Sequence, residues 1–356
     1  DLRMSRGLGD VYKRQVYTMP EFLERRYNPQ SRTILSVISL VSYVLTKVAV
    51  TVYAGGLVFQ QVFGIKELWG IDFFWIAAIG LVVLTALYTI FGGMKSVLYT
   101  SVLQTPILLL GSLIILVLGF KELGGWDEMM RVCGAVTVND YGDTMTNLIR
   151  SNDDANFPWL GALIGSAIIG FWYWCTDQFI VQRVLSGKNE MEARRGTIFG
   201  AYLKLLPVFL FLIPGMIAFA LHQKYIGAGG EGFLPMLANG TANADAAFPT
   251  LVAKLLPAGV KGLVVCGILA ALMSSLASLF NSSAMLFTID FYKRFRPQTS
   301  EKKLVGIGQV ATVVIVILGI LWIPIMRSVG DVLYTYLQDV QSVLAPVSYT
   351  HLTLPT

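Results

Sequence analysis

The sequence predicts an all-α membrane protein that crosses the bilayer several times. Hydrophobic residues make up 55% of the 356 residues and charged residues only 14%, whereas a typical soluble domain carries about 25% charged residues. The mean hydropathy is +0.64. Seven separate stretches are apolar over the roughly 20 residues that a helix needs to cross a membrane. Composition and segment length together exclude an ordinary soluble domain.

The expected spans follow one another along most of the chain. They cover residues 34–63, 72–92, 98–119, 158–182, 197–221, 258–290 and 304–326, and a truncated eighth covers 331–347. The two ends of the chain, DLRMSRGLGDVYKRQ and SYTHLTLPT, do not fit the adjoining spans. We therefore expect a transmembrane domain over 16–347, with non-native tails over 1–15 and 348–356.

Basic residues fall in every second loop between the expected spans. They are Arg25, Arg26, Arg32, Lys95, Arg183, Lys188, Arg194, Arg195, Lys293, Arg294, Arg296, Lys302 and Lys303. The longest loop, 120–157, is mainly acidic. Because cytoplasmic loops are enriched in Lys and Arg, we expect the basic loops to face the cytoplasm and the acidic loop to face outside.

The segment FWYWCTDQFIVQRVLSGKN, residues 171–189, places an acid and an amide near the end of an apolar span. Polar groups inside a span are costly and usually face a protein or water-filled interior. Asp177 and Gln178 are therefore expected to mark a pathway or a binding site, with a buried hydrogen-bond anchor as the equal alternative.

Two lysines also lie within expected spans. At midspan, Lys204 in GAYLKLLPVF would cost about 2.5–3.5 kcal/mol on insertion scales. It lies too far into the span for an easy reach to the surface. A donor that points at a solute hydroxyl or a partner acceptor is therefore favoured over snorkelling. Lys47 is similarly embedded, and we expect a structural pairing for it, with an acid elsewhere.

The segment MSSLASLFNSSA, residues 273–284, places small hydroxyl residues among bulky apolar ones. One interpretation is helix packing, because small and hydroxyl residues let membrane helices approach and hydrogen-bond. The other is an alkali-cation site, since hard cations prefer oxygen ligands and transporter ion sites combine hydroxyls with helical carbonyls. Ser274 and Ser275 are adjacent, and Ala271 lies one turn before them.

Six segments of the chain resemble the solute:sodium symporter family, and within it the sodium/glucose cotransporters. They are VYTMPEFLERRYNP, LYTIFGGMKSVLYTSVLQ, WYWCTDQFIVQR, AYLKLLPVFLFLIPGMIA, LAALMSSLASLFNSSAMLFTIDFYKR and LYTYLQDVQSVLAP. The second resembles a helix–loop–helix. The resemblance implies an inverted-repeat sodium symporter fold, here without its first two core helices. It also implies sodium-coupled symport of a monosaccharide such as glucose or galactose by alternating access.

The resemblance implies a sodium site on the sixth expected span. Ala271 through its carbonyl, and Ser274 and Ser275 through their hydroxyls, match the family's ligands on this helix. Ser101 stands where many relatives have an aspartate tied to a second sodium site. Because a neutral hydroxyl cannot supply that charge, one coupled sodium is expected rather than two. The residues assigned to an ion path are Asp177, Gln178 and Ser101.

The resemblance also implies a solute site. Tyr173 matches the inner-gate tyrosine that closes beneath the sugar and Trp174 its aromatic neighbour, although both could be packing or membrane-belt aromatics. A ring against a pyranose buries C–H surface. Lys204 and Gln338 match sugar-binding residues, and an amide supplies both donor and acceptor. Gly170 stands where sugar transporters usually have a polar side chain, which leaves the sugar open.

The expected partners are the sodium ion as coupling ion, a small polar solute and the lipid bilayer, with no nucleic acid and no other cofactor or metal. No enzyme is expected, because the sequence shows no phosphate loop, HExxH or GxSxG motif. The widely separated Cys133, Cys175 and Cys266 predict neither disulfides nor a metal site. A bacterial cytoplasmic membrane is the expected location. The alternatives are a symporter for myo-inositol, sialic acid or another solute, or a transporter-like sensor module of a signalling protein.

Overall fold

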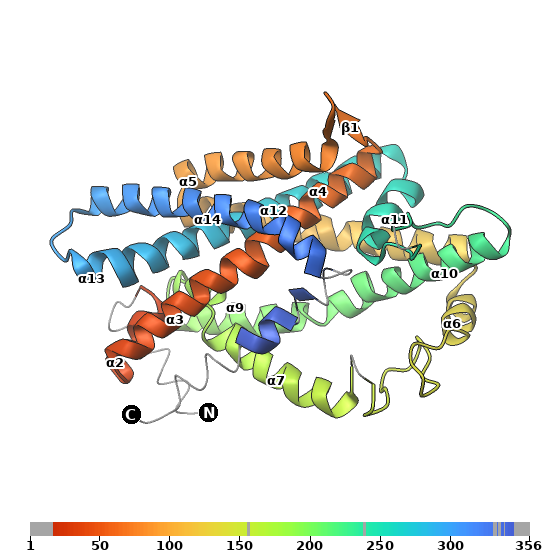
Figure 1. The fold of residues 1–356 in the computed structure, drawn as a ribbon, viewed down its shortest axis with the longest axis horizontal. Helices are drawn as coiled ribbons and strands as arrows, with labels where there is room; N and C mark the ends of the chain where they lie inside the picture. The colour runs from red at the N-terminus through yellow and green to blue at the C-terminus, as the bar shows by residue number, and fades with distance from the viewer. Residues whose placement is uncertain are drawn as a thin grey trace.

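The computed structural model describes residues 17–154, 157–237, 240–329, 333, 336–337 and 339–344. Within them the fold is a bundle of helices (Figure 1), and the only strands are β1 (Glu67–Leu68) and β2 (Ile71–Asp72), an antiparallel pair. The helices, with π-helical or 3₁₀ segments marked η, are α2 (Met19–Arg26), α3 (Pro29–Ser42), η1 (Tyr43–Val48), α4 (Ala49–Phe63), α5 (Phe73–Leu123), α6 (Trp126–Gly134), α7 (Trp159–Cys175), α8 (Gln178–Leu185), α9 (Glu190–Leu203), η2 (Val208–Leu212), α10 (Ile213–Gly227), η3 (Ala244–Ala246), α11 (Ala247–Leu255), α12 (Ala258–Met285), η4 (Leu286–Tyr292), α13 (Lys293–Phe295) and α14 (Glu301–Val329).

The all-α membrane prediction is confirmed, with fewer clear spans than expected. In the described part of the chain, five stretches are long and apolar enough to cross a membrane, namely Pro29–Phe63, Gln104–Leu123, Glu190–Gly227, Ala258–Phe295 and Glu301–Met326. A sixth forms if α7 and α8, which bend by 47° at a break, count as one span. Within the expected span 72–92, the structure gives the shorter apolar stretch Phe73–Leu87. Both expected tails, and about half of 331–347, lie outside the described residues.

The loop expected between the second and third spans is helical instead, because α5 is a single helix of 51 residues. A straight helix of that length would extend about 76 Å, more than twice the roughly 30 Å hydrocarbon core. Its two parts also contact different helices. Leu81 lies against Gly55 of α4, whereas Ile107 lies against Gly267 of α12. We infer that α5 supplies two membrane segments, as the apolar pattern predicts.

Helix starts agree with local sequence signals. Asn28 precedes α3 and its side chain accepts a hydrogen bond from Ser31 N at 2.8 Å. Asn189 precedes α9 and accepts from Glu192 N at 2.9 Å. Such caps satisfy backbone donors that the first turn of a helix leaves free. The basic residues expected in the loop after the fourth span lie largely in helices: Arg183 in α8, and Arg194 and Arg195 in α9.

The apolar interior forms two main clusters, and α12 contributes to both. One joins η1, α4, the first part of α5, the second half of α12 and α14. The other joins the second part of α5, α6, α10, α11 and the first half of α12. Figure 1 shows α12 running past α4, α5 and α14, with α7 and α9 along the lower side. This central helix carries the hydroxyl residues predicted to bind sodium.

Candidate functional site

The predicted sodium ligands share one turn of α12. Ala271, Ser274 and Ser275 follow the three- and four-residue spacing that places side chains on one face of a helix. Ser274 is buried and Ser275 is half-buried. On α5, Ser101 places its Oγ 2.6 Å from Ser274 Oγ, and either hydroxyl can donate. Ser101, which the sequence assigned to an ion path, therefore lies at the predicted sodium site itself.

One turn further along α12, Ser278 connects this helix to α8. Its Oγ accepts a hydrogen bond from Arg183 Nη2 at 2.6 Å, and its carbonyl accepts from Gln182 Nε2 at 3.0 Å. The Arg183 guanidinium also lies 4.8 Å from the ring centroid of Phe179. The prediction that Arg183 is a loop charge is wrong: the residue lies in α8 and is half-buried against the hydroxyl face of α12. No local sequence signal distinguishes it from the exposed arginines that follow.

Three of the residues assigned to the solute lie together. Lys204 Nζ is 4.7 Å from the ring centroid of Tyr173 and 5.0 Å from that of Trp174. The two rings meet edge to face, with their centroids 5.8 Å apart. Among the described residues the Lys204 ammonium has no acidic partner. The fourth assigned residue, Gln338, lies outside the described residues.

A proline explains why Lys204 is at the end of a helix inside a span. Helix α9 ends at Leu203, and the chain resumes as the π-helical η2 after Pro207. Pro207 has no N–H to donate to the Leu203 carbonyl, so it interrupts a helix at that place. Lys204 is exposed in the structure and lies beside the rings of α7. The arrangement can present a charged donor and two aromatic faces to one ligand.

The span that carries these rings is broken between Cys175 and Gln178, where α7 ends and α8 begins at an angle of 47°. Asp177 lies in the break and caps α8, accepting from Phe179 N at 3.1 Å. It also accepts from Tyr43 Oη at 2.7 Å and forms a buried ion pair with Lys47. Asp177 is thus the acid that pairs with Lys47, and in the structure it serves as a hydrogen-bond anchor.

Gln178 makes a different connection, to the segment before α2. Its Oε1 accepts from Met19 N at 2.8 Å and its Nε2 donates to the Tyr17 carbonyl at 3.2 Å. Between these two residues, Thr18 donates its hydroxyl proton to Asp290 Oδ1 at 2.9 Å. The segment 17–19 therefore connects α8 to η4, at the end of the helix that carries the serines.

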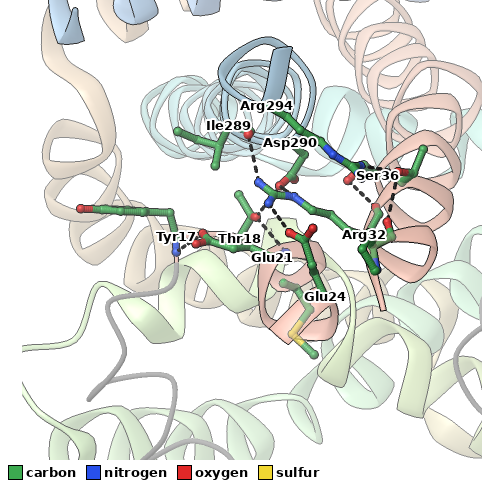
Figure 2. Close-up of polar contacts among 12 residues, drawn as sticks. Tyr17, Thr18, Glu21, Glu24, Arg32, Ser36, Ile289, Asp290 and Arg294 are labelled. Carbon is green, nitrogen blue, oxygen red and sulfur yellow. Dashed lines mark hydrogen bonds and ion pairs between the residues drawn. The ribbon is translucent and has the colours of Figure 1, made fainter. Parts of the chain in front are cut away.

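Figure 2 shows the ionic cluster around Asp290. Arg32 on α3 donates from Nε to Asp290 Oδ1 at 2.8 Å and from Nη2 to the Ile289 carbonyl at 3.0 Å, and it forms an ion pair with Glu24. The side chain of Asp290 is fully buried and that of Arg32 is 12% exposed. Arg32 was expected as a loop charge before the first span. In the structure it lies in α3, within the apolar stretch Pro29–Phe63, and pairs with Asp290 of η4.

Comparison with known proteins shows that the chain is similar to sodium-coupled transporters. The model of the sodium:solute symporter family matches residues 7–354. Sodium/glucose cotransporter 4 of Mus musculus is 37% identical, over 93% of this chain and 49% of that protein. Sodium/myo-inositol cotransporter 2 of Bos taurus is 39% identical, over 93% of this chain and 50% of that protein. The chain spans about half the length of these curated relatives.

A solved structure gives the same result for the fold. A Na+-coupled sialic acid symporter, described in a substrate-bound outward-open state, aligns with a TM-score of 0.74. The alignment covers 98% of this chain and 68% of that chain at 22% sequence identity. At this identity the likeness concerns the arrangement of helices.

Proposed function

Because the chain belongs to the sodium:solute symporter family, we propose that it forms part of a transporter that couples sodium entry to the uptake of a polyhydroxylated solute. The observation that carries the proposal is the hydroxyl cluster on α12, where Ser101 of α5 meets Ser274 at 2.6 Å. Two helices that are far apart in the sequence supply oxygen atoms to the same cluster around the buried Ser274. Hydroxyl and carbonyl oxygens are the ligands that hard cations prefer.

In this proposal sodium is held by the carbonyl of Ala271 and the hydroxyls of Ser274, Ser275 and Ser101. All four groups are neutral, so none of these residues supplies a negative charge to balance that of the ion. A site of this kind favours weak, readily reversible binding, which suits an ion that must enter and leave in each cycle. We keep the proposal of one coupled sodium rather than two, because Ser101 stands where the resemblance places an aspartate tied to a second site.

The solute would bind at the cluster of Lys204, Tyr173 and Trp174. Ring faces cover the C–H surface of a sugar or inositol, while an ammonium donates to its hydroxyls. The relatives are named for glucose and myo-inositol, both rings with several hydroxyls, and we propose a solute of this class. A monosaccharide is favoured, with myo-inositol and sialic acid as the alternatives.

Tyr173 would also act as the inner gate. It lies two residues before the end of α7, where the span breaks and bends by 47°. Transporter sites are typically formed at discontinuous helices, and alternating access moves one part of the bundle against another around the fixed site. We place the protein in a cytoplasmic membrane, where a sodium gradient supplies the driving force, and in a bacterial cell.

Uptake by vesicles that contain the transporter tests the proposal. Radiolabelled glucose, galactose, myo-inositol and sialic acid are supplied one at a time, with an inward sodium gradient or with potassium replacing sodium. We expect accumulation of at least one polyol that depends on sodium and collapses when the gradient is dissipated by a sodium ionophore. Equal uptake of all four solutes with and without sodium would refute coupling.

A further inference from the structure

The break between α7 and α8 depends on one buried carboxylate. Thr176 N and Asp177 N both donate to the Trp172 carbonyl, at 3.0 and 3.2 Å, which ends α7. Asp177 Oδ1 then accepts from Phe179 N, which starts α8. The side chain of Asp177 is only 1% exposed. A buried charge of this kind is tolerated only with a partner of opposite charge and with its remaining lone pairs satisfied.

Lys47 supplies the opposite charge from a distant part of the chain. It lies in η1, the π-helical turn inside the first span, and its side chain is 11% exposed. Tyr43, one turn earlier, donates to the same carboxylate at 2.7 Å and accepts from Phe179 N at 2.9 Å. Single π-helical turns inside α-helices often mark functional positions. The first span therefore holds the break through two side chains of one turn.

The Lys47 ammonium also contacts rings on both sides of the break. Its Nζ lies 5.9 Å from the ring centroid of Trp172 and 5.5 Å from that of Tyr173, both on α7. On α8, the ring of Phe179 lies 4.7 Å away. Each of these contacts is within the range of cation–π attraction. A change in the angle between α7 and α8 must alter this set of contacts.

We propose that Lys47 is a positioning residue for the inner gate: through Asp177 and the surrounding rings it fixes the angle of the break and the resting orientation of Tyr173. The inference rests on the proposed function of Tyr173 as a gate. It predicts that Lys47 governs how often the gate opens, and that it does not contribute to solute affinity. Lys204 approaches the same ring of Tyr173 at 4.7 Å and is the residue expected to set affinity.

Native thiols make the angle measurable without transport. Cys175 is the last residue of α7 and is exposed and free, and Cys266 on α12 is also exposed and free. The alkylation rate of Cys175 therefore reports the end of α7, while that of Cys266 reports the rest of the bundle. Each is measured in the full transporter, in lipid vesicles, with the other cysteine replaced by Ser.

We expect Lys47→Met to change the alkylation rate of Cys175 by about tenfold and that of Cys266 by less than twofold. Maximal sodium-driven uptake should fall about tenfold, with the half-saturating solute concentration unchanged. Lys47→Arg, which keeps the charge, should recover most of both effects. Lys254→Met is the matched control, because Lys254 donates to the Phe233 carbonyl at 2.8 Å and covers the Phe233 ring at 4.7 Å, away from the break.

The double variant Lys47→Met with Asp177→Asn separates positioning from a mere charge penalty. It removes both charges and keeps a side-chain oxygen to cap α8. The proposal expects the double variant to stay as altered as Lys47→Met. Recovery of the parental Cys175 rate in the double variant would show that Lys47 only neutralises a buried carboxylate, and would overturn the proposal. An unchanged Cys175 rate in both variants would also overturn it, even if uptake remains sodium-dependent and the proposed function stands.

Discussion

Ser101 Oγ of α5 and Ser274 Oγ of α12 lie 2.6 Å apart, although the two residues are 173 positions apart in the sequence. The contact is at a tight helix interface. A Cβ built on Gly111 of α5 would overlap with Val264 Cγ2 of α12. The absence of side chains at such glycines lets the two helices approach closely enough for short hydroxyl groups to meet. Close packing of α5 and α12 thus creates the oxygen cluster proposed to bind sodium.

Ser274→Ala and Ser101→Ala should each weaken sodium activation of uptake. Removing one oxygen that contacts a charged group costs roughly 1.5–3 kcal/mol, or about tenfold and more in affinity. The half-saturating sodium concentration should rise by this factor, with protein abundance unchanged. Ser166→Ala is the control, since that exposed hydroxyl on α7 only donates to the Leu163 carbonyl at 3.1 Å. Parental sodium curves for both variants would show that the site is assigned wrongly.

Lys204→Met should weaken solute binding while sodium activation stays near the parental value. The substitution keeps most of the apolar volume beside Tyr173 and removes the charged donor. Because Lys204 is exposed, the lower end of the range for a charged hydrogen bond applies, about tenfold in half-saturating solute concentration. Lys224→Met, which removes a donor to the Leu123 carbonyl at 3.0 Å, is the matched control. Unchanged solute affinity in Lys204→Met would assign Lys204 to structure alone.

Arg32→Met should destabilise the protein strongly. The substitution leaves the fully buried carboxylate of Asp290 without its ionic partner, and breaking a buried pair from one side costs about 3–5 kcal/mol. Arg25→Met removes a more exposed pair with Glu21, whose side chains are 40% and 14% exposed, and should cost no more than about 1 kcal/mol. Thermal unfolding in detergent measures both. Equal midpoints for the two variants would contradict the structural role given to Asp290.

Gly267→Ala should be destabilising, whereas Gly262→Ala on the same helix should not. A Cβ at Gly267 would lie 2.8 Å from Ile107 Cγ2 of α5, while nothing lies within 4 Å of one at Gly262. Overpacking of this kind costs about 1–3 kcal/mol, and an alanine in an open helical position gains up to about 1 kcal/mol. Unfolding midpoints in detergent should therefore fall for Gly267→Ala and should not fall for Gly262→Ala.

The orientation of the chain can be tested without a substrate. With Cys175 and Cys266 replaced by Ser, a cysteine at Asp140 in the acidic loop should react with an impermeant thiol reagent added to intact cells. A cysteine at Lys188, between α8 and α9, should react only after the membrane is permeabilised. The reverse pattern would invert the predicted orientation.

Hydropathy predicted the main spans because each apolar run is long enough to be read locally. The family prediction is confirmed by the match over residues 7–354. The resemblance assigned Lys204 to the sugar and Tyr173 to the inner gate beneath it, and the structure brings these two residues together. Two kinds of feature could not be predicted from the sequence. Half-buried arginines such as Arg183 look like loop charges when only sequence neighbours are considered. The partner of Lys47 could not be named, because Asp177 lies 130 positions further along the chain and the sequence carries no signal of their contact.

Three of the spans contain a π-helical turn, η1, η2 and η4. A π-helical turn holds one residue more than an α-helical turn, so it can be gained or lost with one residue of chain length. Deleting one residue within η2 would then convert the turn to α-helix while Ile217 and Leu221 of α10, both fully buried, keep their places in the core. Single-residue insertions and deletions in these turns are consequently a route by which such a transporter can diversify. They alter the shape of a site without repacking the bundle around it.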